Sequence, residues 1–166
     1  RVDAHLRQMR REVLRHYDVL ALGEASAVTI EAARQYTSPD GSELDLIFQF
    51  EHMDLDGGET FKWNDRRIPL VRLKQVLTKW QQGLEGSGWN ALFWCNHDQP
   101  RIVSRLGDEG AHWEASATML ATCLLTMKGT PFIYQGEEIG MLNMPFDDPG
   151  QLRDIESLAA YRRLTE

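Results

Sequence analysis

Apolar residues along the chain follow two kinds of spacing, one typical of helices and one typical of buried strands. Repeats at three and four residues predict amphipathic helices over residues 4–16, 26–35, 69–83, 113–128 and 151–163. Short continuous apolar runs predict strands that are buried on both faces, over residues 19–23, 44–50, 91–95 and 130–134. Ser26 is expected to cap the second helix.

Helix and strand alternate along the chain, and this order predicts an α/β fold. Parallel strands joined by right-handed helical crossovers satisfy such an order. Four predicted strands are half of an eight-stranded barrel. In parallel α/β folds the functional sites lie beyond the carboxyl ends of the strands, so the residues that follow the strands are the first candidates for chemistry.

The bulk composition narrows the possible partners. The 166 residues are 42% hydrophobic and carry a formal net charge of -7, which fits a globular chain and disfavours nucleic acid and anionic membranes as partners. No apolar run approaches the roughly 20 residues that span a bilayer. Cys95 and Cys123 lie in apolar segments and are expected to be buried thiols. The chain opens at Arg1 directly into a helical pattern, so we expect a piece of a longer protein.

Polar residues follow three of the predicted strands. Glu24 comes after the first strand, Glu51 and His52 after the second, and residues 96–98, Asn-His-Asp, after the third. Alternate strands of a barrel point side chains into the same layer, so Glu24 and Asp98 are expected to face one pocket. Two carboxyl groups flanking a bond are what glycosidic hydrolysis requires, and desolvation would favour the protonated form of Glu24.

The polar residues after the strands allow structural as well as functional interpretations. Glu24 could be an ion-pair partner or a loop acceptor, while His97 offers a donor for hydroxyl groups and Arg101 a fork that orients a carboxylate. No complete metal-ligand pattern is present, and we expect neither a metal nor a cofactor, although four residues are of ligand type: Glu51, His52, Asp54 and Asp56.

The other acidic and aromatic residues receive simpler interpretations. Glu137 and Glu138 are expected to anchor the loop after the fourth strand. Trp80 and Trp113 fall on apolar helix stripes and are expected in the core. Trp63 lies in a loop on the face that carries the strand ends, where it could stack on a sugar.

Three motifs give the chain a resemblance to a known family. Residues 19–24, 93–101 and 129–141 resemble the segments of strands five, seven and eight of the α-amylase superfamily, glycoside hydrolase family 13. Residues 48–56, 78–81 and 99–101 look most like those of oligo-1,6-glucosidases and related α-glucosidases. The resemblance covers nearly the whole chain and implies the C-terminal half of a TIM (β/α)8 barrel, about strands five to eight.

The resemblance also implies roles for four residues. Glu24 matches the general acid/base, Asp98 the carboxylate that stabilises the transition state, and His97 a residue that binds hydroxyl groups of the nonreducing glucose. Arg101 matches a substrate-binding motif position of the subgroup, with a less defined role. The implied activity is that of a retaining exo-acting α-glucosidase on short oligosaccharides.

The family's nucleophile, an aspartate at the end of strand four, has no counterpart here, because Asp3 stands at a helix start. We therefore expect residues 1–143 to be a partial catalytic domain, residues 144–166 a following loop and helix, and the isolated chain to be inactive. Two unpaired strand edges would favour self-association. We expect a cytoplasmic location.

Two alternative functions remain. A trehalose-6-phosphate hydrolase would need a cationic phosphate site, and the loop residues Lys62, Arg66 and Arg67 keep that reading open. A noncatalytic glycosidase-like subunit, such as the heavy chain of an amino-acid transporter, could have lost the acids, but Glu24, His97 and Asp98 are intact. A carbohydrate-binding module seldom uses half of a βα barrel.

Overall fold

The computed structural model describes residues 2–41, 43–57, 62–64 and 66–166. The prediction of a longer protein rests partly on Arg1, which lies outside the described residues, as does part of the loop in which Trp63 was expected.

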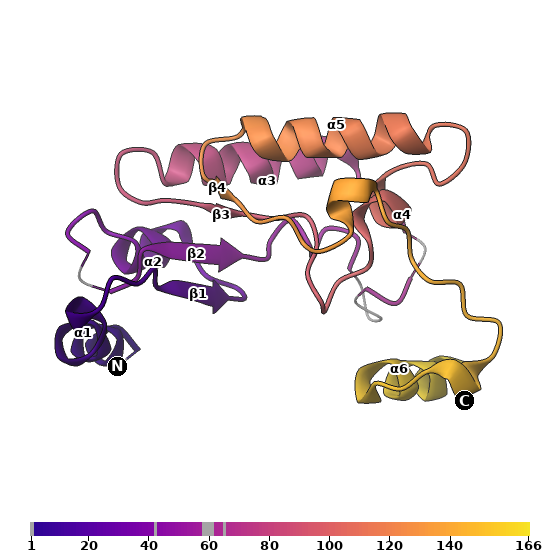
Figure 1. Ribbon diagram of the computed structural model, residues 1–166, viewed down its shortest axis with the longest axis horizontal. Coiled ribbons are helices and arrows are strands. Elements are labelled where there is room, and N and C mark those ends of the chain that lie inside the picture. The colour runs from indigo at the N-terminus through magenta and orange to yellow at the C-terminus, as the bar shows by residue number, and fades with distance from the viewer. Residues whose placement is uncertain (1, 42, 58–61, 65) are drawn as a thin grey trace.

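The described residues form four short strands. These strands lie at the centre of the molecule (Figure 1). Strand β1 (Leu22–Ala25) pairs in parallel with β2 (Leu46–Gln49), and β3 (Ala91–Leu92) pairs in parallel with β4 (Thr130–Pro131). A parallel bridge between Ile47 and Asn90 links the two pairs. The strands thus follow one another in chain order, and the predicted parallel α/β arrangement is confirmed.

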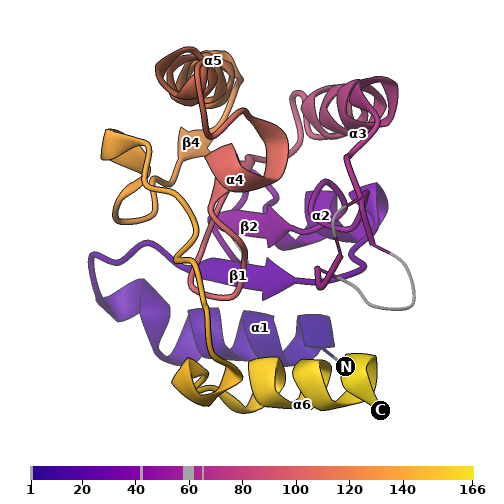
Figure 2. The same ribbon diagram turned by 90° about the vertical axis from the view of Figure 1, so that its right-hand side faces the viewer.

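Helices connect the strands and cover them. Helices α3 (Leu70–Gly83) and α5 (Trp113–Thr126) both lie over the same side of the strands, as Figures 1 and 2 show from two directions. The other helical segments are α1 (Val2–Glu12), η1 (Leu14–His16), α2 (Ile30–Tyr36), α4 (Ile102–Leu106), η2 (Glu137–Ile139), η3 (Pro149–Gln151) and α6 (Ile155–Thr165). None of the helices within the described ranges is long and apolar enough to cross a membrane.

The first βα unit differs from its prediction. Strand β1 starts at Leu22, and Val19 and Leu20 are exposed, so the predicted buried run at 19–23 is wrong. An apolar run shows only that its residues can be buried. Val19 and Leu20 stay exposed because no element of the described chain packs against them. The side chain of Thr29 caps α2 by accepting the backbone N–H of Ala32, so Ser26 is not the cap.

Among the residues that the structure describes, two clusters of buried side chains form the core. One surrounds the chain that continues from β3 through Phe93, Trp94 and Cys95, where it packs on Leu120 and Leu124 of α5. The other joins α2, β2 and α3 through residues that include Ala33, Ile47 and Trp80. The predicted burial of Cys95 and Trp80 is confirmed, and Cys123 is half-buried. The chain beyond β3 is therefore held by burial rather than by further strand pairing.

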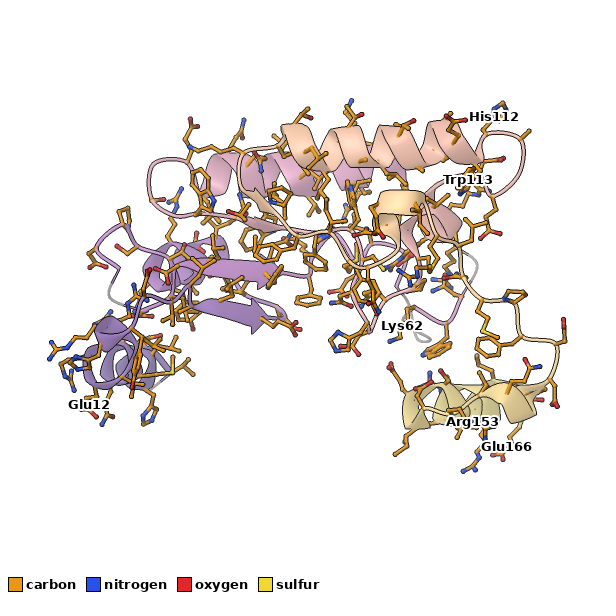
Figure 3. All side chains as sticks on the ribbon, viewed as in Figure 1. Glu12, Lys62, His112, Trp113, Arg153 and Glu166 are labelled. Atoms are coloured by element: carbon orange, nitrogen blue, oxygen red, sulfur yellow. The ribbon has the colours of Figure 1, made fainter. Side chains whose placement is uncertain are left out.

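Trp113 is not a core residue, contrary to its prediction. It is 39% exposed, and its indole Nε1–H donates to the carbonyl oxygen of Gly140 at 2.7 Å. Trp113 is the first residue of α5, and Figure 3 labels it at that end of the helix. A tryptophan at a helix start has the spacing of a core residue but can instead use its N–H as an anchor for a loop.

Candidate functional site

The segment that follows β3 turns sharply at residues 96–99. The backbone N–H of Asp98 donates to Asn96 Oδ1 at 2.9 Å, and that of Gln99 donates to the Asn96 carbonyl oxygen at 3.2 Å. An asparagine that binds the backbone two residues ahead forms a compact turn of this kind. The turn presents His97 and Asp98 outward, with their side chains 70% and 59% exposed and His97 Nε2 lying 3.3 Å from Asp98 Oδ2.

His97 and Asp98 line a cavity of about 590 Å³ between this turn and α6. Trp63 and Phe146 add aromatic surface to the same cavity. The remaining lining residues are Lys62, Gln99, Pro100, Asn143, Met144, Leu152, Asp154, Glu156 and Ser157. Trp63 thus lies on the face that carries the end of β3, as predicted. A carboxylate, an imidazole and an aromatic face can together bind a sugar, and that role stays a prediction.

Lys62 joins the two sides of this cavity. Its Nζ donates to the backbone carbonyl of Asp98 and to Glu156 Oε2 at 2.9 Å. Figure 3 labels Lys62 in the space between the strand-bearing part of the chain and α6. The ammonium is thus held by a carboxylate and a carbonyl oxygen, and it links α6 to the backbone that carries Asp98.

Glu24 lies within β1, not after it, and its side chain is exposed. It is not among the residues that line the cavity at Asp98, so the expected common pocket does not form from these described residues. Glu24 is not desolvated in this chain, and its catalytic role stays a prediction. Strand β2 separates β1 from β3, and the cavity is lined by residues of α6 and by none of β1.

Arg101 points toward the segment that follows β4. Its Nη1 donates to the carbonyl oxygen of Gln135, and its guanidinium lies 4.9 Å from the centre of the Tyr134 ring. Its backbone N–H donates to Asn143 Oδ1 at 2.7 Å. These contacts tie the turn at 96–101 to residues 134–143. Substrate binding by Arg101 stays a prediction.

The acidic residues after β2 bind other protein groups. Glu51 accepts from Lys79 Nζ at 2.8 Å and from Trp80 Nε1 at 2.9 Å. Burial tends to raise the pKa of Glu51, but these donors hold it below the ordinary value of 4.5. Burial raises the pKa of Asp54. Glu51 therefore anchors α3 to the segment after β2.

Arg105 of α4, which sequence reasoning missed, makes a buried ion pair with Asp56. Arg105 Nε lies 2.6 Å from Asp56 Oδ2, and each side chain is only 6% exposed. The available signal in the sequence was a lone cation inside the apolar run at 102–106, a position where a charge needs a partner.

The predicted anchoring role of Glu137 and Glu138 is confirmed. Glu137 Oε2 accepts the backbone N–H of Tyr134 at 2.6 Å, and Glu138 Oε2 accepts that of Gly136 at 2.7 Å. Burial raises the pKa of Glu137. Gly136 has φ of 94°, a conformation that favours glycine and lets the chain turn at this point.

Parallel strands with helical connections, and a cavity beyond the strand end that holds a carboxylate, place the chain in the parallel α/β class. Residues 1–162 match the family described as "Alpha amylase, catalytic domain". The chain belongs to this family, and its fold class is therefore the TIM (β/α)8 barrel. The resemblance inferred from the three motifs is confirmed.

Individual relatives agree with the family. The chain is 53% identical to the oligo-1,6-glucosidase of Bacillus cereus over 161 residues, which are 97% of this chain and 29% of the relative. It is 48% identical to the trehalose-6-phosphate hydrolase of Bacillus subtilis, covering 100% of this chain and 30% of the relative. The chain thus spans less than a third of the length of these curated relatives.

A solved structure gives the same picture. The crystal structure of trehalose-6-phosphate hydrolase from Bacillus licheniformis superposes with a TM-score of 0.92 at 50% identity, over 99% of this chain and 30% of that chain. All three relatives are glycoside hydrolases. Their names give two kinds of substrate, 1,6-linked oligosaccharides and trehalose 6-phosphate.

Proposed function

We propose that this chain is part of the catalytic barrel of a retaining exo-acting α-glucosidase that hydrolyses α-1,6 or α-1,4 bonds of short oligosaccharides. The observation that carries the proposal is the cavity in which Asp98, His97 and Trp63 lie together. The identity of 53% to an oligo-1,6-glucosidase over nearly the whole chain supports it.

We further propose that the chain forms the C-terminal half of the barrel, with β1 to β4 as strands five to eight. Residues 1–143 then belong to the barrel, and residues 144–166 are the loop and helix that follow its last strand. The coverage of 29% of the oligo-1,6-glucosidase fits a part of such a barrel, and the motifs at 19–24, 93–101 and 129–141 give the proposed position within it. Exposed apolar side chains support it as well, since other barrel elements would cover them, among them Val19, Leu20, Val71 and Ile133.

In the proposed reaction Glu24 protonates the leaving glycosidic oxygen, and Asp98 stabilises the positive charge that develops on the sugar. His97 binds a hydroxyl group of the glucose, and Arg101 contributes to substrate binding. The nucleophile that forms the glycosyl-enzyme intermediate is an aspartate outside these 166 residues. Closing the barrel brings Glu24 to the same pocket as Asp98, because alternate strands face one layer. The isolated chain is therefore inactive.

Trehalose 6-phosphate is the alternative substrate, since relatives with that activity are 48% identical. A phosphate would need a cation that is not already neutralised. The ammonium of Lys62 is engaged by Glu156, and the lining also carries Asp98 and Asp154, whereas Arg66 and Arg67 are not among the lining residues. This charge balance favours a neutral glucoside.

The expected self-association of the half barrel and the cytoplasmic location are also part of the proposal. Light scattering tests the first with the 166-residue chain, since unpaired strand edges and exposed apolar surface would produce dimers or larger species. Cell fractionation tests the second.

The test of the activity uses the full-length enzyme with isomaltose, maltose and trehalose 6-phosphate side by side. We expect turnover of the neutral disaccharides and a loss of about 10²- to 10⁴-fold in Glu24→Gln, the usual contribution of general acid catalysis. Near-normal turnover by the variant contradicts the role of Glu24, and a preference for trehalose 6-phosphate contradicts the substrate.

A further inference from the structure

The guanidinium of Arg105 is bound at every one of its donors. Nε and Nη2 bind the two carboxylate oxygens of Asp56, so the ion pair is bidentate. Nη2 also donates to the carbonyl oxygen of Met53, and Nη1 donates to Gln99 Oε1 at 2.9 Å and contacts the Met53 sulfur at 3.5 Å. An arginine has five N–H groups in a fixed fork, and all five are used here. Because the guanidinium is rigid, its contacts hold Asp56, Met53 and Gln99 in fixed positions relative to one another.

These acceptors belong to two segments that are distant in the sequence. Met53 and Asp56 follow β2, whereas Gln99 immediately follows Asp98 in the turn after β3. Arg105 itself comes from α4, which begins just after that turn. The buried fork therefore connects the turn that carries Asp98 to the segment that follows the neighbouring strand.

Contacts other than the Arg105 fork also reach the turn. Arg101 binds Gln135 and Asn143 at exposed positions, and the thiol of Cys95, a weak donor, lies 3.7 Å from the Gln99 carbonyl oxygen. The turn's own hydrogen bonds run from Asp98 and Gln99 back to Asn96, which shapes the turn but does not place it against the barrel. Lys62 binds the Asp98 carbonyl, but Lys62 is tied to α6, beyond the end of the sheet. What distinguishes the Arg105–Asp56 link is that its two charged side chains are buried, each only 6% exposed. A buried charge pair holds its geometry because an alternative arrangement leaves a charge unpaired.

We propose that Arg105 and Asp56 are positioning residues for Asp98. They fix the backbone at Gln99 so that the Asp98 carboxylate points into the cavity, and neither of them lines that cavity. This inference rests on the proposed glucosidase activity. Small displacements of a reacting group lower the rate of the chemical step, about 10²-fold for about 1 Å, and have less effect on ground-state binding.

The first test compares Asp56→Asn and Arg105→Lys with wild type in the full-length enzyme, at a temperature where circular dichroism shows each variant folded. Both substitutions remove the bidentate pair, and lysine cannot reproduce the fork. We expect kcat for an aryl α-glucoside to fall about 10- to 100-fold while KM changes by less than about threefold. We also expect faster hydrogen exchange of the backbone amides of Asp98 and Gln99.

Arg10→Lys is the matched control. Arg10 also holds an aspartate in a bidentate pair, with both distances to Asp45 at 3.0 Å, but it lies on α1 at the other end of the chain. It should leave both kcat and the exchange of Asp98 and Gln99 unchanged. Folded Asp56→Asn and Arg105→Lys enzymes with wild-type kcat and wild-type exchange would overturn the proposal.

Two further variants test the positioning role if Asp56→Asn and Arg105→Lys do not fold. The double variant Asp56→Leu with Arg105→Met replaces the buried pair by apolar side chains, a change that proteins often tolerate. Gln99→Met leaves the ion pair intact and removes only its contact with the turn. We expect faster exchange at Asp98 in both, and unchanged exchange in Gln99→Met would overturn the proposal even if the double variant fails to fold. If the wild-type enzyme hydrolyses no α-glucoside, the proposed function fails, while hydrogen exchange still decides the positioning.

Discussion

The imidazole of His52 binds the backbone of Phe93 inside the core. His52 Nε2 lies 2.9 Å from the Phe93 carbonyl oxygen, and Nδ1 lies 2.9 Å from Gln49 Nε2. Because a carbonyl oxygen only accepts, Nε2 carries the proton and donates it, and Nδ1 accepts from the Gln49 amide. The neutral imidazole thus joins β2 to the chain that leads to Asp98.

The first prediction concerns the pH dependence of this contact. Burial lowers the pKa of His52 to about 4 from its ordinary value of 6.5. Between these two values the unfolded chain binds a proton that the folded chain does not, so acid favours unfolding. We expect the free energy of unfolding to fall by about 3 kcal/mol as the pH drops from about 6.5 to about 4, since one pKa unit corresponds to about 1.4 kcal/mol.

Urea denaturation of wild type and His52→Gln between pH 8 and pH 4 measures this effect. Other groups also respond to acid, so the difference between the two proteins is the relevant quantity. Below pH 6.5 the free energy of unfolding should fall more steeply for wild type than for His52→Gln. Parallel curves for the two proteins would show that His52 does not contribute.

The second prediction concerns Lys62, which links α6 to the backbone of Asp98. In Lys62→Met this link is lost, and we expect faster amide hydrogen exchange in α6. The free energy of unfolding should change by no more than about 1 kcal/mol, because an ion pair with an exposed partner contributes little.

Lys79→Met is the control for this prediction. Lys79 also pairs with a glutamate, Glu51, but it does so on α3, away from α6. Its substitution should leave exchange in α6 unchanged. If α6 exchanges at the wild-type rate in Lys62→Met, the helix is held by other contacts.

The third prediction concerns Trp63 and follows from the proposed glucosidase activity. Its ring lines the cavity with His97 and Asp98, where it can stack on a glucose ring. We expect Trp63→Ala to raise KM for neutral glucosides about tenfold, which corresponds to about 1.4 kcal/mol of lost contact, and Trp63→Phe to raise it less.

Trp89→Ala provides the comparison. Trp89 is also partly exposed, but its Nε1–H binds Thr130 Oγ1, at the opposite end of the strands from Asp98. Its removal should affect stability and leave KM as it is. Equal KM values for Trp63→Ala and wild type would remove Trp63 from the binding site.

Much of the fold could be predicted because helix spacing and apolar runs are local properties of the sequence. Helix α3 was expected at 69–83 and occupies Leu70–Gly83, and the parallel order of the strands followed from the alternation of elements. Local patterns do not contain the neighbours that decide burial. This is why Trp113 and the run at Val19 were misjudged, and why β3 has only two paired residues although its apolar run continues to Cys95.

By itself, the sequence determined the family and the candidate residues at 96–101, because these depend on which side chains stand next to one another along the chain. Only the tertiary structure decided which distant groups meet. It brought Trp63 to Asp98, engaged Lys62 with Glu156, and joined Arg105 to Asp56 and Gln99. Such contacts depend on the three-dimensional course of the backbone, since a charged side chain loses its hydration on burial and is stable only where the fold places its partner.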